Sequence, residues 1–286
     1  MIKQNRAIIV AQSDEHGGHN LGLLNPETKL VGNDKKLYSP QLTETQNMLW
    51  ETREWGREEI KKLAGKSPIV LFKLGDVNQG LVYDVHNRLA GQVEIALMND
   101  LPWLEMKNVI AIRIAEGTSS HSFGYGDAEM ILRERMKDRR PDLDIEVMQH
   151  GLSKVFDCTI DYAHHGPSSG SREWLKGNMA LYYLRDIMMK DILRGRKPPD
   201  LVLRGHYHSL VQVFNRMNGA DGRVYRSWLY VLPALCGANG FAVQVTKSEY
   251  EITNGIVAWE IIDGRVRESF EFVKVTDIRY EENILQ

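Results

Sequence analysis

Short apolar runs alternate with longer amphipathic stretches over the first two thirds of the chain. Most of the apolar runs are continuous, which is typical of strands buried on both faces of a sheet. Ser39 and Pro40 fit the start of the first amphipathic stretch as N-cap and first helical residue. The predicted strands are Ala7–Gln12, Ile69–Leu74, Val109–Ala115, Thr159–Ala163 and Leu201–Arg204, and the predicted helices cover about residues 40–62, 82–99, 128–137 and 172–193.

After Tyr207 the pattern contains strands only, and Asp263-Gly264 is a strong hairpin turn signal. No repeat, low-complexity segment or clear interdomain linker interrupts the chain. We therefore predict a single α/β domain over residues 1–286, with antiparallel strands in residues 209–276 belonging to the same body. These later strands are Val211–Phe214, Trp228–Leu232, Phe241–Thr246, Ile256–Ile262 and Arg265–Val275.

Composition narrows the class of protein. The chain is 43% hydrophobic and 26% charged, ordinary values for a soluble globular protein. The net charge of -2 argues against a protein that coats nucleic acid non-specifically. Neither a long apolar window nor a secretory leader is found, so we expect a cytoplasmic protein with no membrane partner. Cys158 and Cys236 are the only cysteines, so any metal site must use histidine and carboxylate ligands.

Polar residues follow each predicted strand, and the carboxyl ends of strands in an open α/β sheet meet at one edge. In Asp14-x-His16 and His206-x-His208, side chains two residues apart on an extended segment point the same way. Imidazole and carboxylate ligands together suit Mn, Fe or Zn. Each motif alone is equally well explained by a turn or a structural histidine, but their succession at strand ends favours one shared site. The candidates are Asp14, His16, Asp76, His121, His164, His165, His206 and His208.

In this order, the motifs resemble those of the calcineurin-like metallophosphoesterase superfamily, and the resemblance covers about residues 7–208. It implies a two-sheet β-sandwich flanked by helices, in four α/β/β/α layers, whose second sheet is completed by the strands of residues 209–276. More narrowly, three segments resemble metallophosphoesterases encoded by tailed phages and prophages, which implies the host cytoplasm. These segments are Gly117-Thr118-x-x-His121, His164-His165-Gly166-Pro167 followed by Trp174 and Gly177-Asn178, and Gly255-Ile256-Val257.

The resemblance implies a site with two divalent metal ions, Mn before Fe, Zn or Ni. It also implies that a metal-bound hydroxide attacks a phosphate ester while His121 assists the departing oxygen. Because His164 and His165 are adjacent, either could be the metal ligand. His164 is favoured, and His165 would then contact the substrate. By resemblance, Asp14, His16 and His208 hold one metal, His164 and His206 hold the other, and Asp76 bridges both.

One departure from the family pattern concerns the third motif, which is usually Gly-Asn-His. The segment from Gly117 to His121 contains no asparagine, so the second metal is expected to be held more loosely. A hydroxyl of Thr118 or Ser120, the amide of Asn78 or a water would have to take the place of that asparagine.

The resulting hypothesis is a phosphoric ester hydrolase that acts on a phosphodiester of a nucleotide or nucleic acid, as a nuclease or nucleotide phosphodiesterase. The alternatives are a phosphomonoesterase and a non-catalytic binding scaffold with the same fold. Outside the motifs, we expect His19 and His150 to be loop residues, with His19 facing solvent. We expect Glu129 to be a helix N-terminal acid stabilised by the helix dipole.

Overall fold

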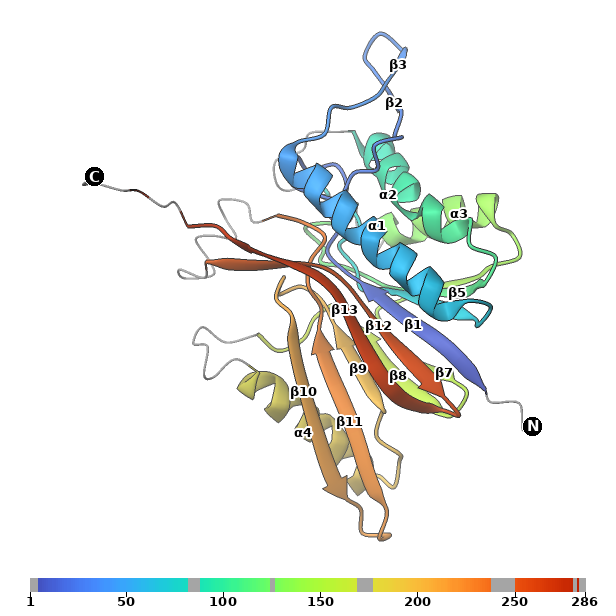
Figure 1. Ribbon diagram of the computed structural model, residues 1–286, viewed down its shortest axis with the longest axis vertical. Coiled ribbons are helices and arrows are strands. Elements are labelled where there is room, and N and C mark those ends of the chain that lie inside the picture. Colours follow the sequence, from blue (N-terminus) through green and yellow to red (C-terminus); the bar gives the residue numbers. More distant parts are fainter. Residues whose placement is uncertain are drawn as a thin grey trace.

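The protein is described here by a computed structural model that covers residues 5–81, 88–123, 127–168, 177–237, 250–279 and 282. In this part of the chain, six strands form one sheet in the order β13-β12-β1-β4-β5-β6 (Figure 1). Neighbours from β1 to β6 are parallel, whereas β12 runs antiparallel to β1. The bounds are β1 Arg6–Gln12, β4 Ile69–Lys73, β5 Val109–Ala115, β6 Asp144–Met148, β12 Glu251–Ile262 and β13 Arg265–Asp277.

The second described sheet has five strands in the order β10-β11-β9-β8-β7. Its central strands are parallel, and antiparallel strands close both edges. Their bounds are β7 His150–Val155, β8 Cys158–Ala163, β9 Leu201–Arg204, β10 Val211–Asn218 and β11 Val224–Val231. A small antiparallel ribbon of β2 Leu30–Val31 and β3 Leu37–Tyr38 projects from the body (Figure 1).

Helices cover the outer face of each sheet (Figure 1). On the six-stranded sheet lie α1 (Glu44–Ala64), α2 (Leu89–Leu104) and α3 (Asp127–Arg139), and α4 (Asn178–Leu193) packs on β10 and β11. The layers therefore run helix, sheet, sheet, helix. This arrangement confirms the predicted α/β fold, a two-sheet sandwich flanked by helices.

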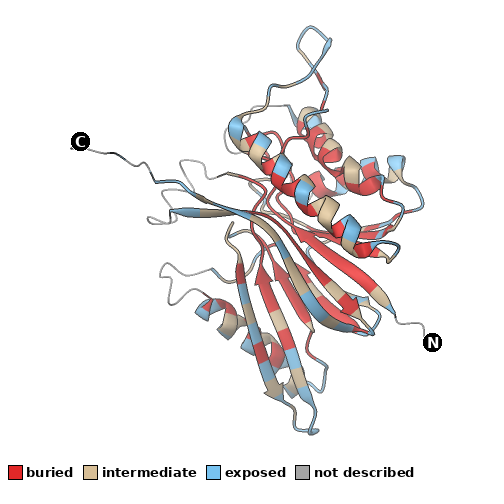
Figure 2. Cartoon of the chain, in the orientation of Figure 1, coloured by how far each residue is buried: buried red, intermediate tan, exposed pale blue. Residues whose placement is uncertain are grey.

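The alternation of side chains along β1 shows how the layers are packed. Ile8 and Val10 join the core beneath α1–α3, whereas Ile9 and Ala11 join the core between the two sheets. A strand buried on both faces must be apolar at every position, which is why this run shows no polar alternation. Figure 2 shows buried positions along β1 and β12. In β13, which forms the edge of the sheet, no position is buried.

The prediction that residues 209–276 complete the second sheet is wrong for half of that segment. Strands β10 and β11 join the second sheet, but β12 and β13 extend the first sheet beside β1. The reason is that β12 also has two apolar faces. Ala258 faces the helices and Trp259 the intersheet core, so β12 fits the buried edge of β1. The predicted strand Phe241–Thr246 lies outside the described residues.

The structure also differs from the prediction at element ends. Helix α1 begins four residues later than expected, because Thr43 and Gln46 form a capping box there. Strands β6 and β7 were not predicted, and His150 begins β7 instead of lying in a loop. Both are sheet edges with few buried residues, so they lack an apolar pattern. Among the described helices, none combines the length and apolar character needed to cross a membrane.

Candidate metal centre

The candidate residues converge where strands of both sheets end. Asp14 and His16 follow β1, Asp76 follows β4, and His164 follows β8. After β9 come His206 and His208, and after β5 comes His121. The two sheets therefore deliver their polar turns to the same edge of the sandwich, as predicted from the motif positions.

The backbone at this edge adopts an unusual conformation. Five of the eight described non-glycine residues with positive φ lie here. Such conformations cost about 1–3 kcal/mol each and persist only where the surroundings enforce them. The clustering of these residues at one edge makes it the candidate functional site. They are Asp14, His16, Asp76, His206 and His208.

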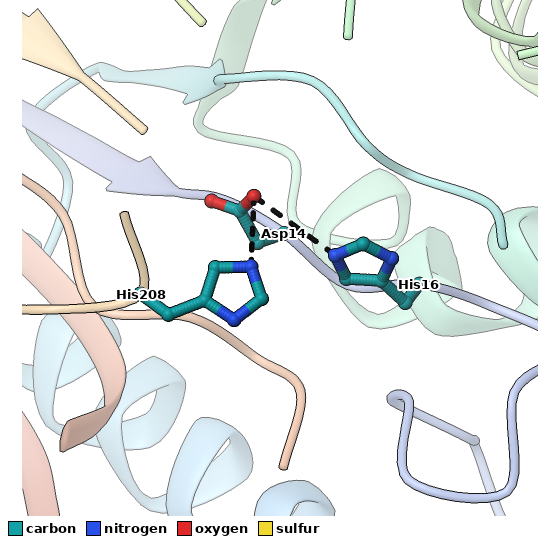
Figure 3. Close-up of side chains that lie close together, drawn as sticks. All are labelled: Asp14, His16 and His208. Atoms are coloured by element: carbon teal, nitrogen blue, oxygen red, sulfur yellow. Dashed lines mark ion pairs between the residues drawn. The ribbon is translucent and has the colours of Figure 1, made fainter. Parts of the chain in front are cut away.

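The first cluster consists of Asp14, His16 and His208, whose ligand atoms all lie within 4.8 Å of one another (Figure 3). Asp14 Oδ1 is 3.3 Å from His208 Nε2 and 4.0 Å from His16 Nε2. The other oxygen, Oδ2, accepts hydrogen bonds from Ser13 Oγ at 2.5 Å and from the backbone amide of His206 at 3.0 Å. The carboxylate is therefore fixed with Oδ1 toward both imidazoles.

The second cluster consists of Asp76, His164 and His206. His164 Nε2 lies 3.1 Å from Asp76 Oδ2 and 3.2 Å from His206 Nδ1. His164 Nδ1 is bonded to the Leu74 carbonyl, which only accepts hydrogen bonds, so Nδ1 carries the proton. Nε2 of His164, which faces the cluster, is therefore the nitrogen suited to binding a metal.

A third grouping connects the two clusters, because Asp76 and His16 also lie within 4.8 Å of a ligand nitrogen of His121. The rings of His16 and His121 are 4.3 Å apart and edge to face. His121 Nδ1 donates to the Gln79 carbonyl at 2.8 Å, which fixes the ring orientation. Asp76 thus has histidines from both clusters beside it.

The electrostatics of the site favour ionised carboxylates. Burial raises the pKa of Asp14 and Asp76, but neighbouring histidines outweigh it and hold both values below the ordinary range. Burial lowers the pKa of His16 to about 3, so this imidazole is neutral at neutral pH. Against the effect of burial, Asp76 raises the pKa of His164 to about 9, and the pKa of His208 is raised by Asp14. The carboxylates thus favour positive charge at the site. Without metal this charge comes from protons on the histidines, and bound cations can take the place of those protons.

Glycine is required where the strand-end turns approach one another. A Cβ on Gly117 would lie 2.3 Å from Asp76 Oδ1, so no side chain fits there. Gly75 has a φ of 82°, and a Cβ on it would lie 2.7 Å from the Cα of Gly117. These two glycines allow the β4 and β5 turns to meet directly behind Asp76.

Thr118, which directly follows Gly117, lies beside Asp76. Its backbone amide donates to Asp76 Oδ1 at 2.6 Å, and its hydroxyl lies 3.0 and 3.2 Å from the two carboxylate oxygens. Ser120 Oγ donates to the Thr118 hydroxyl at 3.2 Å. Asn78 is fully buried as well, and neither atom of its amide makes a hydrogen bond.

Two residues outside the motifs are buried. Glu129 lies in the first turn of α3, as predicted, but it is also completely buried, and its Oε1 accepts a hydrogen bond from the Gly117 amide at 3.2 Å. Burial raises its pKa to about 7. His19 was expected to face solvent, but it is buried, and its Nδ1 accepts from the amide of Leu21.

His165 is exposed and belongs to none of the clusters among the described residues. Its ring is 4.6 Å from that of His206, so it lies at the rim of the site. Sequence reasoning missed the charged residues beneath the first cluster, Lys73, Glu15 and Asp100. A signal was present, since a lysine at the end of a fully apolar strand has to find a partner.

No protein-family model matches the sequence, and no curated protein does. Among solved structures, an archaeal phosphodiesterase is similar at 12% identity, with a TM-score of 0.40, over 89% of this chain and 99% of that one. Vps29 from Entamoeba histolytica with zinc is similar at 15% identity, with a TM-score of 0.31, over 71% and 98%. A metallophosphoesterase from Sphaerobacter thermophilus is similar at 11% identity, with a TM-score of 0.32, over 96% and 89%. Likeness at this level assigns neither family nor activity to this chain, so both have to come from the residues of the site.

Proposed function

We propose that this protein is a metal-dependent phosphoesterase that hydrolyses a phosphodiester of a nucleotide or nucleic acid with two divalent cations. The observation that carries the proposal is that Asp76 lies within 4.8 Å of a ligand nitrogen of His16 in one group of side chains and of His164 and His206 in another. A carboxylate between two sets of imidazoles is suited to bridging two cations. The proposed ligands are Asp14, His16 and His208 for the first metal, His164 and His206 for the second, and Asp76 for both.

The residues present fit such a pair of cations. His16 Nε2 is buried and makes no hydrogen bond, although a buried polar atom ordinarily has a partner. The mixed imidazole and carboxylate donors suit Mn, Fe or Zn. We propose Mn as the resident metal before Fe, Zn or Ni, which requires that metal availability outweigh the weaker intrinsic affinity of Mn. When bound, two divalent cations lower the pKa of a water and neutralise charge on the phosphoryl group.

The protein's own side chains would orient the ester and transfer the proton. Because His121 Nδ1 is bonded to the Gln79 carbonyl, Nε2 is the nitrogen that would deliver a proton to the departing oxygen. His165 is exposed beside His206, where its imidazole can contact a non-bridging phosphate oxygen. Neither role requires a covalent intermediate with the protein.

The rim of the site supports a nucleotide as substrate. Tyr207 stands between two cluster histidines in the sequence, is 39% exposed, and has its ring 5.1 Å from that of His206. An exposed aromatic ring stacks on any nucleobase and contributes about 1–3 kcal/mol per base. A phosphate held by the metals would place a nucleoside group within reach of this ring.

The test begins with chelator-treated protein reloaded with Mn²⁺. Metal content is measured by elemental analysis, and hydrolysis of bis(p-nitrophenyl) phosphate is compared with that of p-nitrophenyl phosphate. We expect about two metals per chain, as a dinuclear site requires, and faster cleavage of the diester. Tyr207→Ala should then slow cleavage of a dinucleotide more than cleavage of the nitrophenyl diester.

The alternatives give different results. Faster cleavage of the monoester would identify a phosphomonoesterase. Failure to bind metal at saturating Mn²⁺, Fe²⁺ and Zn²⁺ would contradict the proposal and favour a non-catalytic scaffold. Ser119→Ala is a suitable control, because Ser119 lies in the same turn as Thr118 but is exposed.

A further inference from the structure

A network of buried charges lies directly beneath the first cluster. Lys73 Nζ contacts Glu15 Oε1 and lies 2.5 Å from Asp100 Oδ2. All three side chains are at most 2% exposed. Gln12 Nε2 donates to Glu15 Oε1 at 2.7 Å, and Gln12 Oε1 accepts from Trp103 Nε1 at 3.1 Å. Charges removed from water in this way are costly unless they are paired. Here one ammonium pairs with two carboxylates, and Glu15 Oε2 makes no hydrogen bond.

The network joins the elements that carry the site. Glu15 lies between Asp14 and His16 in the sequence. Its side chain contacts Lys73, whereas the side chains of its two neighbours belong to the first cluster. Lys73 is the last residue of β4, and Asp100 belongs to α2. The ends of β1 and β4 are thus tied to each other and to a helix at the point where the ligand-bearing turns begin.

The backbone around Glu15 needs such an attachment. Asp14 and His16 have φ values of 55° and 46°, on either side of Glu15. A left-handed conformation at these residue types persists only when surrounding contacts enforce it. The Glu15 carbonyl accepts from the amide of Leu23 at 2.8 Å, and the amide of His16 donates to the backbone carbonyl of Asp76 at 3.0 Å. With the side chain of Glu15 held by Lys73, neither flanking residue can relax without breaking a buried contact.

We propose that the Lys73–Glu15–Asp100 network is a positioning device that holds Asp14 and His16 in the strained conformation needed to bind the first metal. This inference rests on the proposed function, because it assigns a role at the same metal site. The three residues do not touch the metal or the substrate. They act through the backbone of the segment from Asp14 to His16.

This role can be separated from a general contribution to stability. Replacing a buried ion network by neutral groups of similar shape is often neutral for folding, because the cost of burying the charges disappears with them. A positioning role predicts that the same replacement weakens metal binding while the protein stays folded. A purely structural role predicts that stability and both metal affinities fall together.

The test uses the full chain with Glu15→Gln, Lys73→Met and Asp100→Asn combined. The control is Arg6→Met with Glu260→Gln, an ion pair of β1 and β12 at the opposite end of β1. Mn²⁺ affinities are measured by calorimetry, and the first-cluster event is identified as the one that His208→Ala removes. Hydrogen exchange of the His16 and Leu23 amides is measured on the metal-free proteins.

In the triple variant we expect the first-cluster affinity to fall by about tenfold to a hundredfold, the range found for residues that support a ligand. The second-cluster affinity should change less than about threefold, and the two amides should exchange about tenfold faster. The control variant should match wild type in the first-cluster affinity, the second-cluster affinity and the exchange rates of the two amides. Unchanged amide exchange, or equal loss at both clusters, would overturn the positioning role.

The two proposals fail in distinguishable ways. If wild type binds no metal, the proposed function fails, and amide exchange in the metal-free proteins still decides whether the network holds the segment. If the triple variant does not fold, Glu15→Gln alone carries the test, because Gln keeps the shape of Glu and the bond to Gln12. We then expect an affinity about threefold to tenfold lower at the first cluster, and an unchanged value would overturn the role.

Discussion

The two clusters of the site are similar in composition, but the protein supports them in different ways. The first cluster is carried by a strained segment whose central residue, Glu15, is held by buried charges. The second cluster is held by neutral groups, since the Leu74 carbonyl orients His164 and the amide and hydroxyl of Thr118 hold Asp76. The first half of the site is therefore supported by charge pairing in addition to the hydrogen bonds to Asp14, whereas these supports of the second half are hydrogen bonds alone.

This difference indicates how each half should respond to change. A charge network contributes most when all its members act together, because an unpaired buried charge is strongly unfavourable. A hydrogen-bonded support loses its contributions one at a time, at about 1 kcal/mol each. Replacement of the whole network should therefore cost the first cluster more metal affinity than the loss of any one hydrogen bond costs the second.

The largest effect is expected from Asp76→Ala, because Asp76 is the residue that the two halves share. Loss of the bridging carboxylate should lower hydrolysis by about a thousandfold or more and reduce metal content below two per chain. Elemental analysis and diester hydrolysis measure both. Asp142→Ala, at an exposed carboxylate remote from the clusters in sequence, is the control and should leave both unchanged. Full activity of Asp76→Ala would exclude a bridging role.

The next largest effects should distinguish the halves. His208→Ala should remove the first metal and leave the second, and His206→Ala should do the reverse. Each variant should lose activity by about a hundredfold or more, because a single cation cannot perform both roles of the pair. Electron paramagnetic resonance should show coupled Mn²⁺ ions in wild type and an isolated ion in each variant. Coupled ions in either variant would contradict the division into two clusters.

Much of the fold, and the convergence of the candidate residues at one edge, could be predicted from the sequence. Continuous apolar runs identified β1, β4, β5, β8 and β9, because strands buried on both faces carry a strong local signal. The polar residues that follow those strands then had to lie close together, because the carboxyl ends of the strands share one edge. The pairing of β12 with β1 could not be predicted, because apolar residues on two faces do not specify which free edge they cover.

The supports of the site were beyond sequence reasoning for a related reason. Lys73 and Asp100 are 27 residues apart, and nothing local shows that they share a buried contact with Glu15. Glu129 is 12 residues from Gly117 and had an ordinary alternative role at a helix N-terminus. Candidate ligands follow sequence motifs, whereas the residues that support them are brought together only by packing in three dimensions.

A smaller effect should appear in the stability of the metal-free protein when Glu129 is changed to Gln. Burial raises the Glu129 pKa from 4.5 to about 7, with Asp76 adding to the shift and His164 opposing it. The stability gained from the protonated acid is therefore complete below pH 4.5 and lost as pH rises through 7. Gln cannot ionise, so at pH 8 the variant should be more stable than wild type, by at most about 3 kcal/mol.

Urea unfolding of chelated protein at pH 8 and near pH 4.5 measures this difference, which should vanish at the lower pH. Glu134→Gln, at an exposed carboxylate of the same helix, should show no such pH dependence. Equal stability of Glu129→Gln and wild type at pH 8 would mean that the acid is ionised at no cost. The second cluster would then be supported by an ionised Glu129 bonded to Gly117, so both clusters would have a charged support.

The smallest effect is expected from Thr118→Val, which removes one hydroxyl and keeps the backbone amide bonded to Asp76. Because the second cluster is supported by separate hydrogen bonds, its Mn²⁺ affinity should fall only about threefold to tenfold. The first-cluster affinity should not change, and Thr118→Ser, which keeps the hydroxyl, should restore the second. Calorimetry on the three proteins gives the comparison. A loss of about a hundredfold or more with Val would show that the hydroxyl is itself a metal ligand.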